Sequence, residues 1–429
     1  MNAEAVFNRY DIRGEYPEEI DEDFAERLGK AVGTRAVREG RGKVVTGRDD
    51  REASEAVYPA FIRGLRSTGA NLVDIGVGTT DRTALAASHY GGTGAMVTAS
   101  HHSWKRTGFK LLHERGNGFS NQDLEDVEEL FRGGDFETGE GTLINEQNEF
   151  DEIYIEELEE RFDEDALEGA KVVLDAVGGS GRTAPAVFEE LGAKVVEHRR
   201  DGRPDPEPGK DNRSEVKARM EEEEADLAVG YDPDGDRVYV FHPEEGWIDG
   251  DNLFYLISRI VEPDTVVASV DTSPLIEEVG AEVEYTRVGD IFVSERGVQI
   301  GADLLGEPNG HYAVPDFSWY NSGILSSLLM ASRHRDISGM LEEVEDYSTD
   351  RYAEAFEDVE EREEAMKQVK RRVAKNYEVV STVDGLKFEG EGFTGLVRPS
   401  GTSPKIRLVV HVEGESEDGA GEVRKTVFG

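Results

Sequence analysis

A pattern of strand, helix and strand occurs three times in this chain, and it restricts the possible folds more than any other feature. Each copy begins with a short β-branched run and ends with a strand that opens with Gly-Ala. The paired runs begin at Lys43 and Gly69, at Lys171 and Gly192, and at Thr265 and Gly280. Because such crossovers are right-handed and place their strands parallel, the pattern predicts three related α/β domains.

The segments around these copies give the predicted domain boundaries. Residues 133–152 are polar and glycine-rich, which is typical of a linker, and an amphipathic helix is predicted at Ile153–Phe162. Beyond the third copy the pattern changes to a helix, a Glu-rich run and strands, which are predicted at Glu378–Val383, Thr394–Val397 and Ile406–Val412. We therefore expect α/β domains with mixed or parallel sheets, followed by a smaller α+β domain. The predicted bounds are residues 1–148, 149–246, 247–345 and 346–429.

The formal net charge of −44 restricts the partners of the protein. An acidic surface repels polyanions, so we expect neither nucleic acid nor an anionic membrane as a partner. The excess of 92 Asp and Glu over 48 Lys and Arg is typical of proteins from halophilic archaea, because concentrated salt screens the repulsion. The chain has no cysteine, no signal peptide and no apolar run of about 18 residues, which predicts a cytoplasmic protein without disulfides. The oligomeric state stays open.

The first candidate loop is VTASHHSWKRTGFK, residues 97–110, in which Ser100 follows a short apolar strand. Cations in the same stretch would surround a phosphate on this serine, namely His101, Lys105, Arg106 and Lys110. That environment is typical of a phosphoryl carrier. The alternative is ordinary surface hydrogen bonding, whereas a serine hydrolase is disfavoured because a GxSxG motif is missing.

The second candidate loop is DPDGDR, residues 232–237, between two apolar strands. It places carboxylates at alternate positions, Asp232, Asp234 and Asp236, where they can converge on one hard cation such as Mg²⁺. An EF-hand is excluded because Arg237 and a strand follow. A simple Asp-Gly hairpin is the alternative, but it accounts for only part of the acidic cluster.

Two further loops carry groups suited to a sugar and a phosphate. In GEPNGH, residues 306–311, Glu307 and Asn309 can bind vicinal hydroxyls and His311 can move a proton near neutral pH; a solvated turn is the alternative. The terminal loop RPSGTSPKIR can hold a phosphate with backbone amides, hydroxyls and two guanidinium groups. The candidates there are Arg398, Ser400, Gly401, Thr402, Ser403, Lys405 and Arg407.

These loops, in this order and across nearly the whole chain, resemble those of the α-D-phosphohexomutase superfamily of phosphomannomutases, phosphoglucomutases and phosphoglucosamine mutases. TASHHSW resembles its phosphoserine loop, DPDGDR its magnesium loop, GEPNGHY its sugar loop and RPSGTSPKIR its phosphate loop. Tyr10 and Arg13 match the YDIRG motif of the family, and Lys110 matches its GFK lysine. The resemblance implies three α/β domains and a smaller α+β domain around a central cleft.

The resemblance also implies an isomerase that interconverts hexose 1-phosphates and hexose 6-phosphates. Phosphorylated Ser100 would give its phosphate to the sugar, and hexose 1,6-bisphosphate would be the intermediate and activator. Mg²⁺ would be held by Ser100, Asp232, Asp234 and Asp236. The implied catalytic residues are Ser100, His101, Lys110, His311, Arg13 and Arg237, and the implied sugar-binding residues are Tyr10, Glu307, Asn309 and His311.

Departures from the family pattern leave specificity open. His102-Ser103 replaces Asn-Pro, Ser403 replaces a glutamate of the phosphate loop, and Ser294 stands where some members have a lysine. A phosphoglucosamine mutase is therefore an alternative to a phosphomannomutase or phosphoglucomutase. A metal-dependent sugar phosphatase and a sugar-phosphate-binding regulator are further alternatives. Small hexose phosphates are the expected partners in every case.

Overall fold

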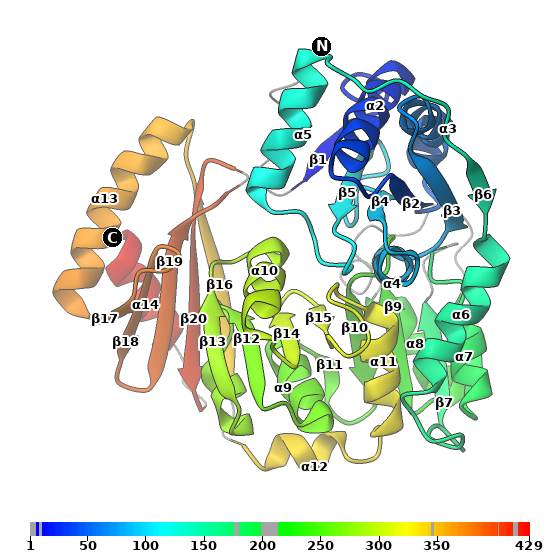
Figure 1. Cartoon of the computed structure of the whole chain (residues 1–429). Helices are drawn as coiled ribbons and strands as arrows, with labels where there is room; N and C mark the ends of the chain where they lie inside the picture. Colours follow the sequence, from blue (N-terminus) through cyan, green and yellow to red (C-terminus); the bar gives the residue numbers. More distant parts are fainter. Residues whose placement is uncertain are drawn as a thin grey trace.

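The computed structural model describes residues 6–7, 11–175, 180–198, 213–344, 347–401, 403–414 and 419–429. The strands within these residues form four sheets, and helices pack against each sheet (Figure 1). The first three units are α/β and the last is α+β, so the predicted fold class is confirmed. Among the described helices, none combines the length and apolarity needed to cross a membrane.

The first sheet has the strand order β1-β5-β4-β2-β3-β6. Its strands are β1 (Ile12–Glu15), β2 (Lys43–Arg48), β3 (Asn71–Val77), β4 (Thr93–Val97), β5 (Arg106–Leu112) and β6 (Leu143–Asn145). Its helices are α2 (Glu22–Arg38), α3 (Glu52–Arg66), α4 (Thr80–Tyr90) and α5 (Asn121–Gly133). β2 is parallel to β3 and β4, whereas β5 is antiparallel to β4. That reversal places Lys110 opposite Met96 of β4.

The second sheet has the order β11-β10-β9-β7-β8. Its elements are α6 (Gln147–Glu159), β7 (Lys171–Asp175), α7 (Ala184–Glu190), β8 (Lys194–Glu197), α8 (Arg213–Glu223), β9 (Leu227–Tyr231), β10 (Val238–His242) and β11 (Gly246–Ile248). The predicted parallel pair of β7 and β8 is confirmed. Residues 133–152, which the sequence predicts to be a linker, contain β6 and the first turns of α6. Helix α6 begins at Gln147, six residues before the predicted Ile153, and so includes a polar first turn.

The third sheet has the order β13-β12-β14-β15. Its elements are α9 (Gly250–Val261), β12 (Thr265–Ser269), η1 (Pro274–Val279), β13 (Glu282–Thr286), α10 (Asp290–Ile300), β14 (Leu304–Glu307), β15 (His311–Ala313), α11 (Gly323–Ser332) and α12 (Ile337–Glu342). β12 and β13 are parallel as predicted. Their crossover is the short 3₁₀ helix η1 instead of an α-helix, because few residues separate the two strands.

The C-terminal sheet is antiparallel, with the order β16-β20-β19-β18-β17. Its elements are β16 (Tyr347–Ala355), α13 (Val359–Asn376), β17 (Glu378–Ser381), β18 (Leu386–Gly390), β19 (Phe393–Pro399), β20 (Lys405–Glu413) and α14 (Gly419–Phe428). The sequence did not predict β16 or β18. β16 is an edge strand with mostly exposed side chains, so it lacks the apolar alternation that marks a half-buried strand.

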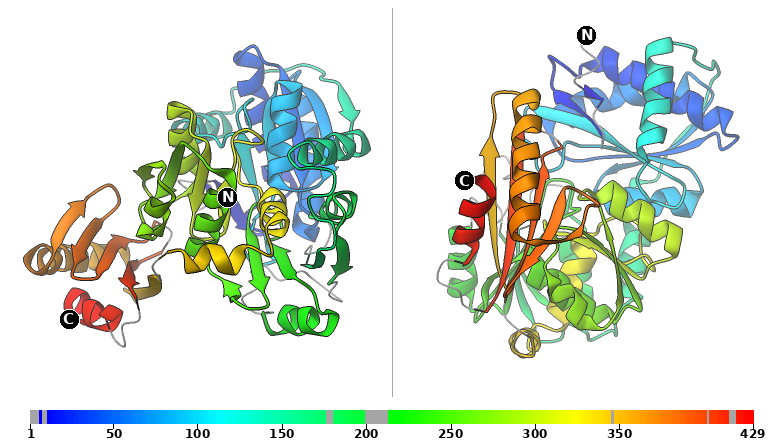
Figure 2. Two further views of the ribbon diagram at one scale, coloured as in Figure 1. Left: turned by 90° about the horizontal axis from the view of Figure 1, so that it is seen from below. Right: turned by 90° about the vertical axis from the view of Figure 1, so that its left-hand side faces the viewer.

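The hydrophobic cores show which domains are held together. One continuous cluster of buried residues joins the first three sheets, from Val45 in the first through Val229 in the second to Leu304 in the third. The C-terminal domain has a cluster of its own, which includes Phe388 and Leu408. Figure 2 shows this domain projecting from the side of the other three. The loops of the first three domains are therefore positioned by shared packing.

Candidate active site

A cavity of about 560 Å³ lies where loops from all four domains meet. Ser100 lines it from the loop after β4, and Asp236 lines it from the loop between β9 and β10. His311 lines it from the start of β15, and Gly401 lines it from the loop between β19 and β20. The structure therefore brings members of all four predicted loops to one cavity.

Ser100 is buried and held in an unusual backbone conformation. Its φ of 49° lies in the left-handed region, which residues other than glycine rarely adopt. Its Oγ donates a hydrogen bond of 2.8 Å to Asp232 Oδ2, and its amide donates to Thr98 Oγ1 at 2.8 Å. The Nδ1 atom of His101 lies 3.4 Å from Ser100 Oγ. The hydroxyl thus faces both an acid cluster and a histidine.

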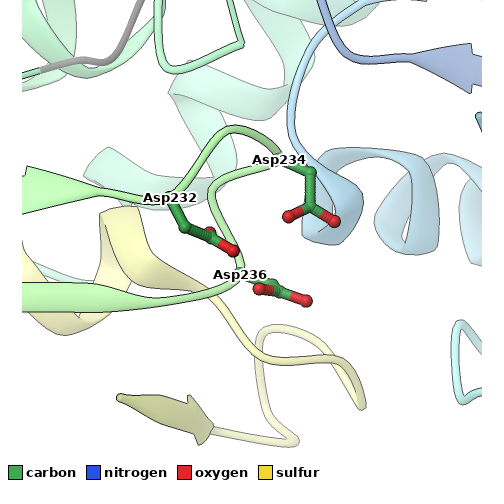
Figure 3. A group of neighbouring side chains, drawn as sticks. All are labelled: Asp232, Asp234 and Asp236. Carbon is green, nitrogen blue, oxygen red and sulfur yellow. The ribbon is translucent and has the colours of Figure 1, made fainter. Parts of the chain in front are cut away.

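The three predicted metal ligands Asp232, Asp234 and Asp236 lie close together on the loop between β9 and β10 (Figure 3). They are all buried, and one ligand atom from each lies within 4.8 Å of the others. Lys110 Nζ donates to Asp234 Oδ2 at 2.7 Å and also contacts Asp236. Asp234 Oδ1 is buried and has no hydrogen-bond partner within the described residues. Buried carboxylates in this excess suit a hard divalent cation such as Mg²⁺.

Charge crowding shifts the pKa values of this cluster. Burial, followed by the neighbouring Asp236 and Asp234, raises the pKa of Asp232 well above its usual value. Burial also opposes ionisation of Asp236, but Lys110 and His311 outweigh it and hold the pKa of Asp236 well below its usual value. A bound cation would favour the ionised form of Asp232, so metal binding at this cluster would release a proton.

The pKa values of two cavity histidines, His101 and His311, are shifted in opposite directions. Burial, followed by the charge of Arg237, lowers the pKa of His101 far below its usual value. Burial opposes protonation of His311 as well, but Asp236 and Glu307 outweigh burial and Arg237 and raise the pKa of His311 to about 9. Two carboxylates flank the His311 ring at 3.3 Å, and both favour its protonated form.

The other predicted sugar-loop residues lie at the same cavity. Glu307 is buried and accepts a hydrogen bond of 2.8 Å from the amide of Gly289, whereas Asn309 lines the cavity from an exposed position. Arg237 Nε lies 3.0 Å from His311 Nε2. Arg13 also lines the cavity and pairs with Asp11 at 2.6 Å. Tyr10 lies outside the described residues.

The predicted phosphate loop reaches the cavity only at its tip. Of its described candidates, Gly401 lines the cavity and the others do not. Arg398 and Arg407 face each other across β19 and β20, which leaves two like charges side by side for an anion to neutralise. Arg398 Nη1 donates to Asp384 Oδ2 at 3.2 Å. Ser403 Oγ donates to Ser400 Oγ at 3.1 Å, Lys405 is exposed, and Thr402 lies outside the described residues.

Sequence reasoning placed four cations around Ser100, and the structure separates them. His101, Arg106 and Lys110 line the cavity, whereas Lys105 is exposed and does not. Arg106 Nε is buried and makes no hydrogen bond within the described residues.

Two residues of the site were missed. Thr80 Oγ1 donates to Asp234 Oδ2 at 2.7 Å, although 154 residues separate them in the chain. Arg51 lies directly beneath the Ser100 loop. The signal for Arg51 was present, because the polar run DDR follows β2 at the carboxyl edge where parallel sheets place their functional loops. Nothing in the sequence points to Thr80.

Comparison with known proteins agrees with this geometry. Models of the phosphoglucomutase/phosphomannomutase α/β/α domains I, II and III match residues 4–138, 152–246 and 249–350, and the model of the C-terminal domain matches residues 343–429. A phosphoglucomutase/phosphomannomutase of Thermococcus kodakarensis is 33% identical over 96% of this chain and 95% of the relative. A protein of Methanopyrus kandleri described as a probable phosphoglucosamine mutase is 33% identical over 97% and 96%.

Among solved structures, a phosphoglucomutase/phosphomannomutase family protein from Burkholderia thailandensis superposes with a TM-score of 0.88. The two chains are 25% identical, and the match covers 99% of this chain and 96% of that one. The likeness therefore includes all four domains and their arrangement around the cavity.

Proposed function

Because the chain belongs to the phosphoglucomutase/phosphomannomutase family and is thus an isomerase of the phosphohexomutase type, we propose that it interconverts hexose 1-phosphates and hexose 6-phosphates through Ser100. One observation carries the assignment of the carrier: Ser100 Oγ lies 2.8 Å from Asp232 in a buried three-aspartate cluster at the wall of the cavity. A phosphate on Ser100 would lie beside both the cluster and the substrate.

The transfer proceeds in two half-reactions. A free hydroxyl of the sugar phosphate attacks phosphorus and the bond to Ser100 Oγ breaks. The hydroxyl proton ends on Ser100 Oγ, and hexose 1,6-bisphosphate results. After the sugar turns around, Ser100 Oγ attacks its other phosphate and the bond between that phosphorus and the sugar oxygen breaks. The serine proton ends on that sugar oxygen, and the isomeric monophosphate leaves. The bisphosphate therefore also reloads an unphosphorylated enzyme, which makes it an activator.

The charge states of the cavity residues suggest a different role for each in the transfer. Burial opposes the charge of Lys110, but Asp234 and Asp236 outweigh it and hold the pKa of Lys110 well above its usual value. The raised pKa values of Lys110 and His311 favour their charged forms, which would stabilise the moving phosphate. His101 Nδ1 lies 3.4 Å from Ser100 Oγ, but its lowered pKa makes the ring a weak base, so its proposed role is that of a neutral hydrogen-bond partner of the serine.

The aspartate cluster is the proposed Mg²⁺ site. Asp232, Asp234, Asp236 and the phosphorylated Ser100 would hold the ion, which would neutralise charge as phosphorus changes partners. Asp232 accepts the Ser100 hydrogen bond in the unphosphorylated chain and so keeps the hydroxyl directed at the cluster. The exposed Asn309 and the buried Glu307 are the proposed contacts for sugar hydroxyls.

The terminal loop is the proposed holder of the phosphate that does not react. Ser400, Gly401, Thr402, Ser403 and the arginine pair of β19 and β20 carry the donors for it. Holding this group away from the reaction supplies binding energy that orients the sugar. Because relatives are named both phosphoglucomutase/phosphomannomutase and phosphoglucosamine mutase, the substrate panel comprises glucose, mannose and glucosamine phosphates.

Coupled assays at high salt with Mg²⁺ test the proposal. The 1-phosphates and 6-phosphates of the three sugars should interconvert, intact-mass analysis should show one phosphate, and peptide mapping should place it on Ser100. The Ser100→Ala variant should lose both activity and phosphate. Release of inorganic phosphate without isomerisation would instead identify a phosphatase, and binding without turnover would identify a regulator.

A further inference from the structure

Arg51 and Asp49 form a fully buried ion pair beneath the loop that carries Ser100. Arg51 Nε lies 2.9 Å from Asp49 Oδ2. Arg51 Nη1 donates to the carbonyl oxygens of His102 and Ser103 at 2.7 and 3.0 Å, and Nη2 donates to the carbonyl of Ser100. One guanidinium therefore binds three backbone carbonyls within four consecutive residues.

Backbone hydrogen bonds also hold the loop, because the amides of His102 and Arg106 donate to the carbonyls of Ala99 and Ser103 at 3.1 and 2.9 Å. No proline occurs between Ser100 and Lys110, so no ring fixes a φ angle in this stretch. The Arg51 guanidinium carbon lies 4.7 Å from the centre of the Trp104 ring, which adds a cation–π contact to the same group. Arg51 is thus held by an acid and an aromatic ring while it holds the loop.

These contacts fix the left-handed backbone conformation of Ser100. A non-glycine residue keeps such a conformation only where its surroundings fix it. Both peptide groups of Ser100 are fixed, because Thr98 Oγ1 accepts from its amide and Arg51 donates to its carbonyl. With the backbone fixed in this way, the side chain points at Asp232.

We propose that Arg51 is a positioning residue for phosphoryl transfer, which fixes the Ser100 loop so that Oγ faces the aspartate cluster. This inference rests on the proposed function of Ser100. Arg51 does not line the cavity, so it acts through the loop and does not touch the substrate. Lysine cannot replace it, because an ammonium group lacks the planar fork that reaches several carbonyls and an acid at once.

Arg82 provides a matched control. It is also buried, pairs with Asp151 at 2.8 Å and donates to the carbonyls of Ile75 and Gln147 at 2.9 Å. Its guanidinium carbon lies 5.4 Å from the Phe150 ring centre. Arg82 does not line the cavity and does not contact the Ser100 loop. Replacing either arginine with lysine removes the same kind of contacts, but only Arg51→Lys frees the carrier loop.

The test measures turnover and loop protection in both variants at high salt with Mg²⁺. Arg51→Lys should lower kcat about 100-fold with KM nearly unchanged, since a displaced nucleophile loses alignment and not affinity. Amide hydrogen exchange of residues 99–104 should quicken in the same variant. Arg82→Lys should change neither, although its melting temperature should fall by a comparable amount.

Several results would overturn the inference: equal kcat losses in the two variants, unchanged exchange of the loop, or faster exchange with normal kcat. If Arg51→Lys does not fold, the test uses Trp104→Leu. This variant removes only the cation–π contact of the Arg51 guanidinium, and kcat should fall about 10-fold. Absence of mutase activity in the wild-type protein would refute the proposed function. Hydrogen exchange needs no turnover, so it would still show whether Arg51 fixes the loop.

Discussion

At the residue scale, Lys110 occupies the position from which a cation neutralises the aspartate cluster. Its Nζ contacts both Asp234 and Asp236, so a metal ion bound by the cluster would share these carboxylates with an ammonium group. Asp234 Oδ1, which has no partner among the described residues, is the atom that this arrangement leaves open. Removing the charge of Asp234 would therefore weaken the binding of Mg²⁺ and the ion pair with Lys110.

The first prediction concerns Asp234→Asn. The change should lower kcat at least about 100-fold and weaken Mg²⁺ binding, because it removes a ligand charge and the partner of Lys110. Mutase rate against Mg²⁺ concentration and calorimetric titration with Mg²⁺ measure the two effects. Asp81→Asn is the control, since Asp81 is equally buried but bonds the Tyr154 hydroxyl. Full activity of Asp234→Asn in excess chelator would contradict the metal assignment.

The candidate loops could be found from the sequence because each concentrates unusual side chains in a few consecutive residues. Ser100 and the three aspartates can be recognised in this way. The contact between Thr80 and Asp234 could not be found, since it joins two domains. The charge of His311 could not be found either, because it depends on burial and on Asp236.

At the element scale, the start of α11 packs directly against the loop between β9 and β10, which carries the three aspartates and is called the metal loop below. The amide of Gly323 donates to the carbonyl of Gly235 at 3.0 Å. A Cβ on Gly323 would lie 2.6 Å from the carbonyl oxygen of Arg237 and 2.8 Å from that of Gly235, and both atoms belong to the backbone. The third domain thus supports the loop of the second at a distance that only glycine allows.

The second prediction follows from this contact. Gly323→Ala should displace the metal loop and weaken Mg²⁺ binding about 10-fold, as is typical when support behind a metal ligand is lost. Calorimetric titration measures the affinity. Gly339→Ala in α12 is the matched control, because a Cβ there would have no described atom within 4 Å. Equal Mg²⁺ affinities in the two variants would show that α11 does not position the loop.

The third prediction concerns the buried His411 on β20, which faces α9 and β16. Thr349 Oγ1 lies 2.9 Å from His411 Nδ1 and donates to Asp251 at 3.4 Å. Burial, followed by Arg351 and Lys387, lowers the pKa of His411 to about 3, and the backbone of Asp271 raises it slightly. The neutral ring therefore contributes stability that is present above pH 6.5 and lost as the pH falls toward 3.

As the pH falls from 7 to 5, protonation of His411 in the unfolded chain should lower the free energy of unfolding by about 2 kcal/mol. Asp251 acts in the opposite direction, because burial raises its pKa to about 6 and its protonated form is favoured as the pH falls. His411→Gln retains Asp251 and removes only the histidine term. Its unfolding free energy should decrease less than that of the wild type between these pH values. Chemical denaturation at both pH values measures this, with the exposed His89→Gln as control, and parallel losses in all three proteins would exclude the effect.

The elements that the sequence predicted well are those with strong apolar runs. The parallel pairs of the three repeats were found because buried β-branched strands and Gly-Ala openings recur. β16 was missed because its side chains face solvent, and the 3₁₀ crossover η1 was missed because helix type depends on the length available between two strands.

At the scale of the whole molecule, polar contacts connect the C-terminal domain to the third domain. Arg351 pairs with Asp251 at 3.2 Å, and Asp384 accepts from the amide of Val288 at 3.3 Å. With a net charge of −44, the domains also repel one another when salt is scarce. The interface should therefore loosen more readily than the cores.

The fourth prediction is that activity falls at a higher salt concentration than secondary structure does. Dilution from 1 M to 0.01 M salt lengthens the range of repulsion from about 3 Å to about 30 Å, which spans an interdomain contact. Mutase rate and far-ultraviolet dichroism, followed together during dialysis, measure the two transitions. Sucrose at matched osmolality should not restore activity, because it does not screen charge. Full activity in dilute buffer would refute the salt adaptation expected from the composition.

The separate core of the C-terminal domain affects how this chain can diverge. Substitutions that repack Val373, Phe388 and Leu408 leave the packing beneath Ser100 and the aspartates unchanged. The part that would hold the remote phosphate can therefore drift, or be exchanged by recombination, while the part that would transfer phosphate keeps its geometry. New preferences for a phosphorylated sugar can arise in such a chain by replacing one module.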